Sequence, residues 1–207
     1  MRDPARGAPT EMPARASELR FAADALRRLP LPVAWFTLRA RRRARSGGDE
    51  FSLRSALRPR KLAALLDTAA GAHNVVELGT GTGWTTIALA LADPARTVLS
   101  YDIVARERDP YLALVADSVR ERITFVTAPG EVGPGERSGV ELLFVDSSHE
   151  CEPTLAQIAA WRPALAPGAL VVFDDYEHPD YPGVAEAVRA LGAQGSARAS
   201  MFIWRPS

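Results

Sequence analysis

Short apolar runs alternate with helical stretches along the last two thirds of the chain. The runs have the near-continuous apolar character of strands that are buried on both faces, and they cover residues 74–78, 97–101, 123–127, 141–145 and 169–173. Helical periodicity is found over residues 85–91, 110–119, 154–165 and 184–191. A last β-like run over 200–204 would add an edge strand, which could run antiparallel to its neighbour. The pattern predicts an α/β, Rossmann-like domain with a mostly parallel sheet of six or seven strands and helices on both faces.

The chain before residue 72 has a different pattern. Helices are predicted over residues 17–29, 33–38 and 59–70, the second of which ends at the arginine cluster Arg39–Arg45. Residues 1–16 are rich in proline, alanine and arginine without periodicity, so we expect a disordered or loosely attached tail. The predicted organisation is a tail over 1–16, a helical segment over 17–71 that acts as a lid or a dimer contact, and a Rossmann-like domain over 72–207.

Composition narrows the class of protein. With 207 residues, 47% of them hydrophobic, the chain can bury a full core. The single cysteine, Cys151, excludes an internal disulfide framework and is typical of a reducing compartment. No apolar run approaches the roughly 20 residues that cross a bilayer, and the first residues contain no signal-peptide pattern. We therefore expect a cytoplasmic protein without a membrane partner.

Charge is unevenly distributed along a chain whose formal net charge is zero. Residues 1–60 contain 14 arginines, no lysine and six acidic residues. Such a basic segment can bind nucleic acid, but few aromatic residues for base stacking are interleaved with the arginine cluster. We interpret it as a solvated face and do not predict a nucleic-acid partner. The single lysine, Lys61, is interpreted as a sign of a coding preference for arginine.

A glycine-rich loop follows the first predicted strand. Gly79, Gly81 and Gly83 allow a tight turn and a close approach of the backbone to a ligand. The dinucleotide fingerprint requires a further glycine where Trp84 stands. With Glu77 two residues before the first glycine, the loop resembles the first motif of class I methyltransferases. That resemblance implies S-adenosylmethionine as cofactor, bound by Glu77, Gly79, Thr80, Gly81, Gly83 and Trp84; Trp84 either walls the methionine end or packs the helix.

A second acidic residue supports this interpretation. Asp102 ends the second predicted strand, where a carboxylate can accept hydrogen bonds from both ribose hydroxyls. A NAD-dependent oxidoreductase would place an acid similarly, so Asp102 alone does not separate the two classes. The glycine spacing favours the methyltransferase.

Three carboxylates end two further strands. Asp146 ends the fourth, and Asp174 and Asp175 end the fifth. These strands are adjacent in the methyltransferase order, and burying three like charges without a partner is costly. Mg²⁺ removes that cost and prefers oxygen ligands. The alternative is that Asp146 contacts the cofactor while the pair caps a loop.

The stretch from Asp146 to Tyr176 resembles small-molecule O-methyltransferases related to catechol O-methyltransferase and to antibiotic-sugar enzymes. Trp161-Arg162-Pro163 and Ala166-Pro167-Gly168 belong to the same resemblance. It implies Mg²⁺ at Asp146, Asp174 and Asp175, and cofactor contacts at Ala128 and Asp146. It also implies a small-molecule hydroxyl acceptor: a catechol, a phenol, a sugar or a natural-product intermediate.

The predicted general base is His149. Catechol-type enzymes place a lysine at this position, three residues after the strand-four acid. An imidazole with a pKa near about 6.5 can accept a proton at neutral pH. Sugar-type enzymes have an Asp just before this position, but here it is Ser148, which is no base. A capping or packing role for His149 stays open, and His178 is a second candidate.

Two other functions remain as alternatives. An RNA methyltransferase could use the basic segment, and a non-catalytic module could keep only cofactor binding. Base amino-group methylation is disfavoured because no Asn/Asp-Pro-Pro-aromatic motif follows the fourth strand. The sequence therefore predicts a metal-assisted O-methyltransferase of small molecules.

Overall fold

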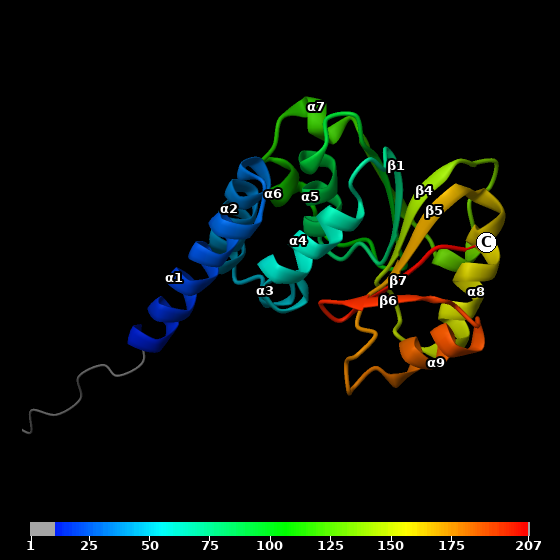
Figure 1. The fold of residues 1–207 in the computed structure, drawn as a ribbon. Coiled ribbons are helices and arrows are strands. Elements are labelled where there is room, and N and C mark those ends of the chain that lie inside the picture. The colour runs from blue at the N-terminus through cyan, green and yellow to red at the C-terminus, as the bar shows by residue number, and fades with distance from the viewer. Residues whose placement is uncertain (1–10, 207) are drawn as a thin grey trace, which may run out of the picture.

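The computed structural model describes residues 11–206, and within them seven strands form one sheet. The strand order is β3-β2-β1-β4-β5-β7-β6 (Figure 1). The strands are β1 Asn74–Leu78, β2 Thr97–Asp102, β3 Ile123–Thr127, β4 Val140–Val145, β5 Leu165–Phe173, β6 Gly195–Arg198 and β7 Met201–Trp204. Strands β1 to β5 run parallel, whereas β7 is antiparallel to β5 and to β6. The predicted α/β class and the antiparallel direction of the last strand are confirmed, but β7 is not the edge strand that was predicted, because β6 pairs with its outer side.

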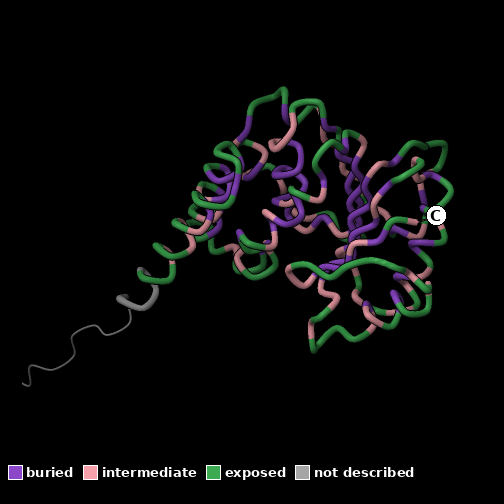
Figure 2. Tube along the Cα trace, viewed as in Figure 1, coloured by how far each residue is buried: buried purple, intermediate pink, exposed green. Residues whose placement is uncertain are grey.

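Helices cover both faces of the sheet (Figure 1). They are α1 Glu11–Arg28, α2 Leu31–Gly47, α3 Glu50–Ser55, α4 Pro59–Thr68, α5 Trp84–Ala92, α6 Asp109–Leu112, α7 Asp117–Arg120, α8 Cys151–Trp161 and α9 Pro182–Ala190. Side chains alternate along the strands, so Val75 faces the core under α2, α4 and α5 while Val76 faces the core under α8 and α9. Figure 2 shows burial concentrated in the central strands, with α1 mostly exposed. The central parallel strands β1, β2 and β4 are buried on both faces, as their apolar runs predict, whereas the edge strand β3 is partly exposed.

Helix α2 does not end at the arginine cluster, so that prediction is wrong. Ala40 and Ala44 are buried at a spacing of one helical turn, while Arg42, Arg43 and Arg45 are exposed. The arginine run is therefore the solvated face of a continuing helix. Its end is set by Gly48, which has a left-handed φ of 68°.

Other boundaries also differ from the prediction. The helix predicted over 110–119 is two short helices, α6 and α7. Strand β6 was not predicted because all four of its residues are exposed and it lacks the apolar pattern of a buried strand. Of the tail predicted over 1–16, residues 1–10 lie outside the described residues, and α1 begins at Glu11. None of the described helices is long and apolar enough to cross a membrane.

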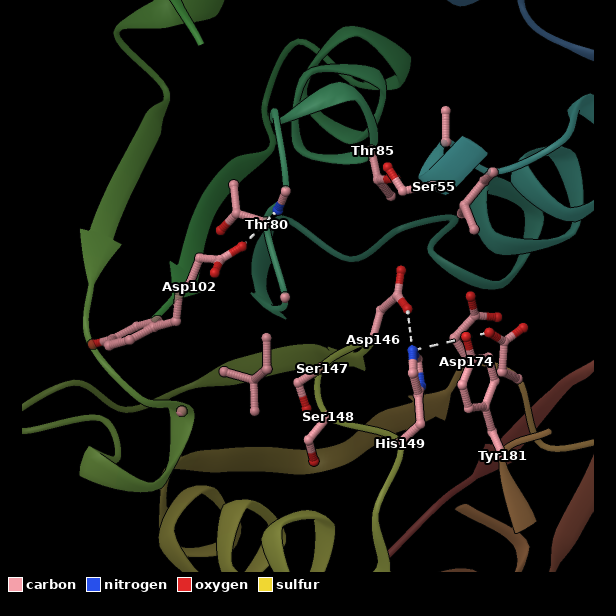
Figure 3. Close-up of a pocket in the computed structure, with 18 of the residues that line it drawn as sticks. Ser55, Thr80, Thr85, Asp102, Asp146, Ser147, Ser148, His149, Asp174 and Tyr181 are labelled. Atoms are coloured by element: carbon pink, nitrogen blue, oxygen red, sulfur yellow. Dashed lines mark hydrogen bonds and ion pairs between the residues drawn. The ribbon is translucent and has the colours of Figure 1, made fainter. Parts of the chain in front are cut away.

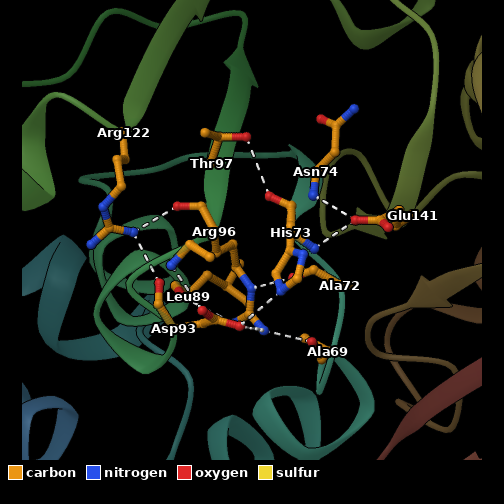
Figure 4. A network of polar contacts seen from close by, with 11 residues as sticks. Ala69, Ala72, His73, Asn74, Leu89, Asp93, Arg96, Thr97, Arg122 and Glu141 are labelled. Atoms are coloured by element: carbon orange, nitrogen blue, oxygen red, sulfur yellow. Dashed lines mark hydrogen bonds and ion pairs between the residues drawn. The ribbon is translucent and has the colours of Figure 1, made fainter.

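A buried arginine joins helices α4 and α5 to the start of β1 (Figure 4). Arg96 is only 2% exposed, and its guanidinium donates to the backbone oxygens of Ala69, Ala72 and Leu89 at 2.5, 2.8 and 3.0 Å. Ala69 follows the last residue of α4, and Leu89 lies in α5. A buried guanidinium needs such partners. Arg96 thereby fixes the position of α4, whose opposite end borders the cavity described next.

Candidate active site

A cavity of about 1220 Å³ lies at the carboxyl ends of β1, β2, β4 and β5. Strands β2 and β3 lie on one side of β1, and β4 and β5 lie on its other side, so the strand order switches direction between β1 and β4, where open α/β sheets bind ligands. Helix α3 and the start of α4 supply another wall, through Phe51, Ser55 and Lys61. The volume is sufficient for a cofactor and a small acceptor side by side.

The glycine loop approaches the end of β4 too closely for any side chain. A Cβ added to Gly79 would lie 1.7 Å from the Asp146 carbonyl oxygen, and Gly79 has a φ of 101°. Gly83, with a φ of 84°, precedes α5 directly. Both positions therefore require glycine. Gly79 and Gly81 line the cavity, whereas Gly83 shapes the turn without lining it.

Glu77 was expected to bind the cofactor, but it lies beneath the loop and does not line the cavity. Its carboxylate accepts hydrogen bonds from the hydroxyls of Thr86, very short, and Ser100, at 2.6 Å. Burial raises the pKa of Glu77 to about 7. Glu77 faces the core under α5, because it is one residue out of phase with Leu78 on the strand. In this structure Glu77 supports the loop from below, through the hydroxyls of Thr86 and Ser100.

Asp102 lies beside the loop and lines the cavity (Figure 3). Its two carboxylate oxygens accept hydrogen bonds from the backbone N–H of Gly81, at 2.7 Å, and of Val104, at 2.9 Å. Each oxygen keeps a lone pair for a ribose hydroxyl. The remaining predicted cofactor residues that line the cavity are Thr80, Trp84, Ala128 and Asp146.

Trp84 packs against its neighbours and also borders the cavity. Its ring packs edge-on against Tyr111, with centroids 5.2 Å apart, and it also lines the cavity. The buried Nε1 donor of Trp84 has no hydrogen-bond partner. An unpaired buried donor at a cavity wall is a position where a ligand can accept a hydrogen bond.

The segment after β3 forms the far end of the cavity with α8. Gln157 receives a hydrogen bond from Ser147 at 2.8 Å and donates one to Glu131 at 3.3 Å. All three residues line the cavity next to Ala128. Gln157 and Glu131 were not predicted as site residues, because neither stands at a strand end or in a motif.

The N-terminal helices are joined to the glycine loop by side chains. Ser52 and Thr82 share a hydrogen bond of 2.6 Å between their hydroxyls, and the Tyr111 hydroxyl donates a very short hydrogen bond to Asp49. Asp49 is also the N-cap of α3 and accepts from the Ser52 N–H. The helical segment is therefore a fixed wall of the site in this structure.

Asp174 and Asp175 share one cation, the ammonium of Lys61. The Lys61 Nζ lies 2.7 Å from Asp174 Oδ1 and 2.6 Å from Asp175 Oδ1. Asp174 is almost fully buried, and burial raises its pKa although Lys61 opposes that shift. Sequence analysis missed Lys61. Its being the single lysine of the chain was the available signal, and it was interpreted as a coding preference.

The expected Mg²⁺ site can be tested against this arrangement. Among residues 11–206, no three His, Cys, Asp or Glu side chains come together in a way that could hold a metal ion. The ammonium of Lys61 lies against the two carboxylates that were expected to ligate the ion. Burial and the charges of Asp174 and Asp175 raise the pKa of Asp146 well above its usual range. As arranged, these residues do not fit a divalent cation.

His149 lies between the carboxylates at the ends of β4 and β5 (Figure 3). Its Nε2 is 3.8 Å from Asp146 Oδ1 and 4.0 Å from Asp175 Oδ2. Its ring stacks on Tyr181 with centroids 4.5 Å apart. Burial lowers the pKa of His149, so the imidazole is neutral at pH 7 and able to accept a proton.

His178, the second candidate base, also lines the cavity and packs against Tyr181 in a tilted arrangement, with centroids 4.6 Å apart. Its ion-pair neighbour is the exposed Asp180, 3.9 Å away, rather than the cluster at the strand ends. Of the two histidines, His149 is the one surrounded by the carboxylates of β4 and β5.

Comparison with known proteins agrees with the site. Residues 76–176 match the family model of a methyltransferase domain. No curated protein matches the chain.

Several solved structures are similar in fold. They include CalS11, a TDP-rhamnose 3'-O-methyltransferase of calicheamicin biosynthesis (18% identity, 99% of each chain, TM-score 0.56). An O-methyltransferase from Bacillus cereus in complex with S-adenosylhomocysteine is 14% identical over 80% of this chain and 89% of that chain (TM-score 0.62). TomG from Streptomyces achromogenes, an O-methyltransferase of tomaymycin synthesis in complex with S-adenosylmethionine, is 18% identical over 88% of this chain and 99% of that chain (TM-score 0.60). At these identities the likeness establishes a shared fold.

The family match, the sheet order and the glycine loop beside Asp102 concern the same part of the chain. The matched region begins in β1 and ends just beyond β5, so it contains the strand ends that border the cavity. Residues 76–176 therefore match a methyltransferase domain, and the chain has the fold of the solved O-methyltransferases.

Proposed function

We propose that the protein transfers the methyl group of S-adenosylmethionine to a hydroxyl of a small-molecule acceptor. The observation that carries the proposal is the position of His149, a largely buried neutral imidazole in the same cavity as the glycine loop. The O-methyltransferases of similar fold support an oxygen acceptor. The absence of a base-methylating motif after β4 argues against an amino group on a nucleic-acid base.

We expect the cofactor to bind at one end of the cavity and the acceptor at the other. Asp102 would hold the ribose of the cofactor, and the loop over Ala128 would border its adenine. The acceptor would occupy the region between His149, Asp146 and Tyr181, at the ends of β4 and β5. Holding both molecules in one cavity supplies the in-line geometry that methyl transfer needs.

His149 would act as the general base and accept the hydroxyl proton of the acceptor. The hydroxyl oxygen forms a bond to the methyl carbon while the bond from that carbon to sulfur breaks, and its electron pair stays on sulfur. The hydroxyl proton passes to His149 Nε2 and from there to solvent, leaving a methyl ether and S-adenosylhomocysteine. Mg²⁺, which the sequence resemblance implies at Asp146, Asp174 and Asp175, supplies no step in this proposal because Lys61 is paired with two of these carboxylates.

The test compares substitutions of histidines in one acceptor screen. With an acceptor found among phenols, catechols and sugars, His149→Ala should lower kcat by about 10²- to 10⁴-fold, the usual contribution of a general base. Binding of S-adenosylhomocysteine should be unchanged. His73→Ala is the matched control, because His73 lies outside the cavity lining. Full turnover by His149→Ala would exclude His149 as the base, and methylation of RNA in place of every small acceptor would overturn the proposed substrate class.

A further inference from the structure

The position of Lys61 in its helix is electrostatically unfavourable without an acidic partner. Lys61 lies in the first turn of α4, and that turn contains no acidic residue. The amino-terminal end of a helix carries partial positive charge and disfavours a cation. The Lys61 side chain is also only 18% exposed, so its charge has lost most of its hydration. The compensation comes from Asp174 and Asp175, 2.7 and 2.6 Å away.

Helix α4 holds Lys61 rigidly in this position. Leu62, Leu65 and Leu66 are buried in the core under α5, and Arg96 holds the carbonyl of Ala69 just beyond the other end of the helix. The ammonium is therefore carried on a packed element and not on a flexible loop. The contact is built into the fold.

An ammonium and a divalent cation would compete for these carboxylates. Mg²⁺ needs oxygen ligands at about 2.0–2.1 Å in near-octahedral geometry. The Lys61 Nζ already lies within 2.7 Å of one oxygen of each carboxylate. A metal ion bound to the same carboxylates would lie close to the Lys61 ammonium, and two cations close together repel strongly in a partly buried site. A metal could bind Asp174 and Asp175 only after displacing the ammonium.

We infer that Lys61 takes the place of the divalent cation in this site and makes methyl transfer metal-independent, an inference that rests on the proposed function for its catalytic part. An ammonium has three N–H donors; one is hydrogen-bonded to Asp175 Oδ1, and Asp174 Oδ1 lies 2.7 Å from the nitrogen as an ion-pair partner. A remaining N–H is available to an acceptor oxygen, since Lys61 lines the cavity. Donation to that oxygen stabilises the negative charge that develops as His149 removes the proton.

Manganese binding tests the placement of Lys61 without any acceptor. Chelator-treated protein saturated with S-adenosylhomocysteine is titrated with Mn²⁺ by calorimetry and by electron paramagnetic resonance. Wild type and Lys61→Arg should bind no Mn²⁺ at the strand ends, whereas Lys61→Met should gain one site, since its carboxylates lose their cation. Stoichiometric Mn²⁺ binding by wild type, with affinity unchanged in Lys61→Met, would overturn the inference.

Turnover tests the catalytic part. Wild-type kcat should be the same with chelator as with added Mg²⁺, and Lys61→Met should lower it by roughly 10²-fold, as loss of a donor to a developing oxyanion does. Lys61→Arg should restore part of the rate, and Arg189→Met, an exposed charge on α9, should leave it unchanged. Turnover that stops with chelator and returns with Mg²⁺ would overturn the inference.

The two proposals fail in different ways. If no acceptor is methylated with or without metal, the proposed function fails, and the Mn²⁺ titration still decides the position of Lys61. If Lys61→Met does not fold, the Mn²⁺ titration and the chelator experiment on wild type are sufficient to test the inference about Lys61.

Discussion

Single side chains set the chemistry of this site through their charge and burial. Lys61 meets two carboxylates whose repulsion would otherwise need another cation. His149 is neutral because burial lowers its pKa, and Glu77 holds its proton more tightly because burial raises its pKa to about 7. The pKa of each of these two groups therefore differs from that of the same residue when exposed to solvent.

Glu77 makes stability depend on pH. Its pKa rises from 4.5 in the unfolded chain to about 7 in the fold, so the folded state retains a proton that the unfolded state loses. The free energy of unfolding should fall as pH rises through this interval. Glu77→Gln removes the titration, and it should gain up to roughly 3 kcal/mol relative to wild type between about pH 4.5 and 8.

Urea denaturation of both proteins across that pH range measures the difference. Parallel pH profiles for wild type and Glu77→Gln would show that the carboxyl titrates normally in the fold.

At the scale of elements, close approaches between backbones place the residues that we propose to act in catalysis. Gly183, at the start of α9, lies against the loop that carries His149. A Cβ at this position would be 2.7 Å from the His149 carbonyl oxygen and 2.7 Å from the Cys151 nitrogen. Helix α9 can therefore start beside the loop only with glycine here, and this contact brings Tyr181 onto the His149 ring.

Gly183→Ala should separate these two segments. Because the atoms that the new Cβ meets belong to the backbone, we expect a loss of about 1–3 kcal/mol in unfolding free energy. Methyl transfer should fall as well, while S-adenosylhomocysteine binding, at the other end of the cavity, is retained.

Gly47→Ala is the control, since nothing lies within 4 Å of its Cβ and its φ is ordinary. That substitution should change stability by less than about 1 kcal/mol. Equal melting temperatures and equal turnover for the two alanine variants would contradict the packing argument.

Elements with a strong local pattern were predictable from the sequence. The runs that became β1 and β3 have the predicted bounds. For β1 the reason is that a strand buried on both faces is apolar nearly throughout. Strand β6 has no such pattern, and α2 continues past the predicted end because the alanines between its arginines are buried. Those outcomes depend on tertiary packing, which a local pattern does not contain.

At the scale of the whole molecule, the sheet brings distant residues into one cavity. The carboxyl ends of four neighbouring parallel strands, β2, β1, β4 and β5, lie at the same edge of the sheet. A motif at the end of one strand therefore predicts that residues at the other three strand ends lie near it. That rule placed Asp102, Asp146 and Asp174 at the cavity from the sequence alone. It could not place Lys61, whose contact with Asp175 joins residues 114 positions apart and comes from a helix outside the sheet.

The central claim is that this cavity binds S-adenosylmethionine, with Asp102 holding its ribose. Calorimetric titration of S-adenosylhomocysteine into wild type, Asp102→Ala and the exposed control Asp117→Ala tests it most directly. We predict one saturable site in wild type, the same affinity in Asp117→Ala, and a loss of about 10- to 100-fold in Asp102→Ala, the equivalent of one hydrogen bond to a charged group. Wild type that binds no S-adenosylhomocysteine, or Asp102→Ala that binds it as tightly as wild type, would contradict the account.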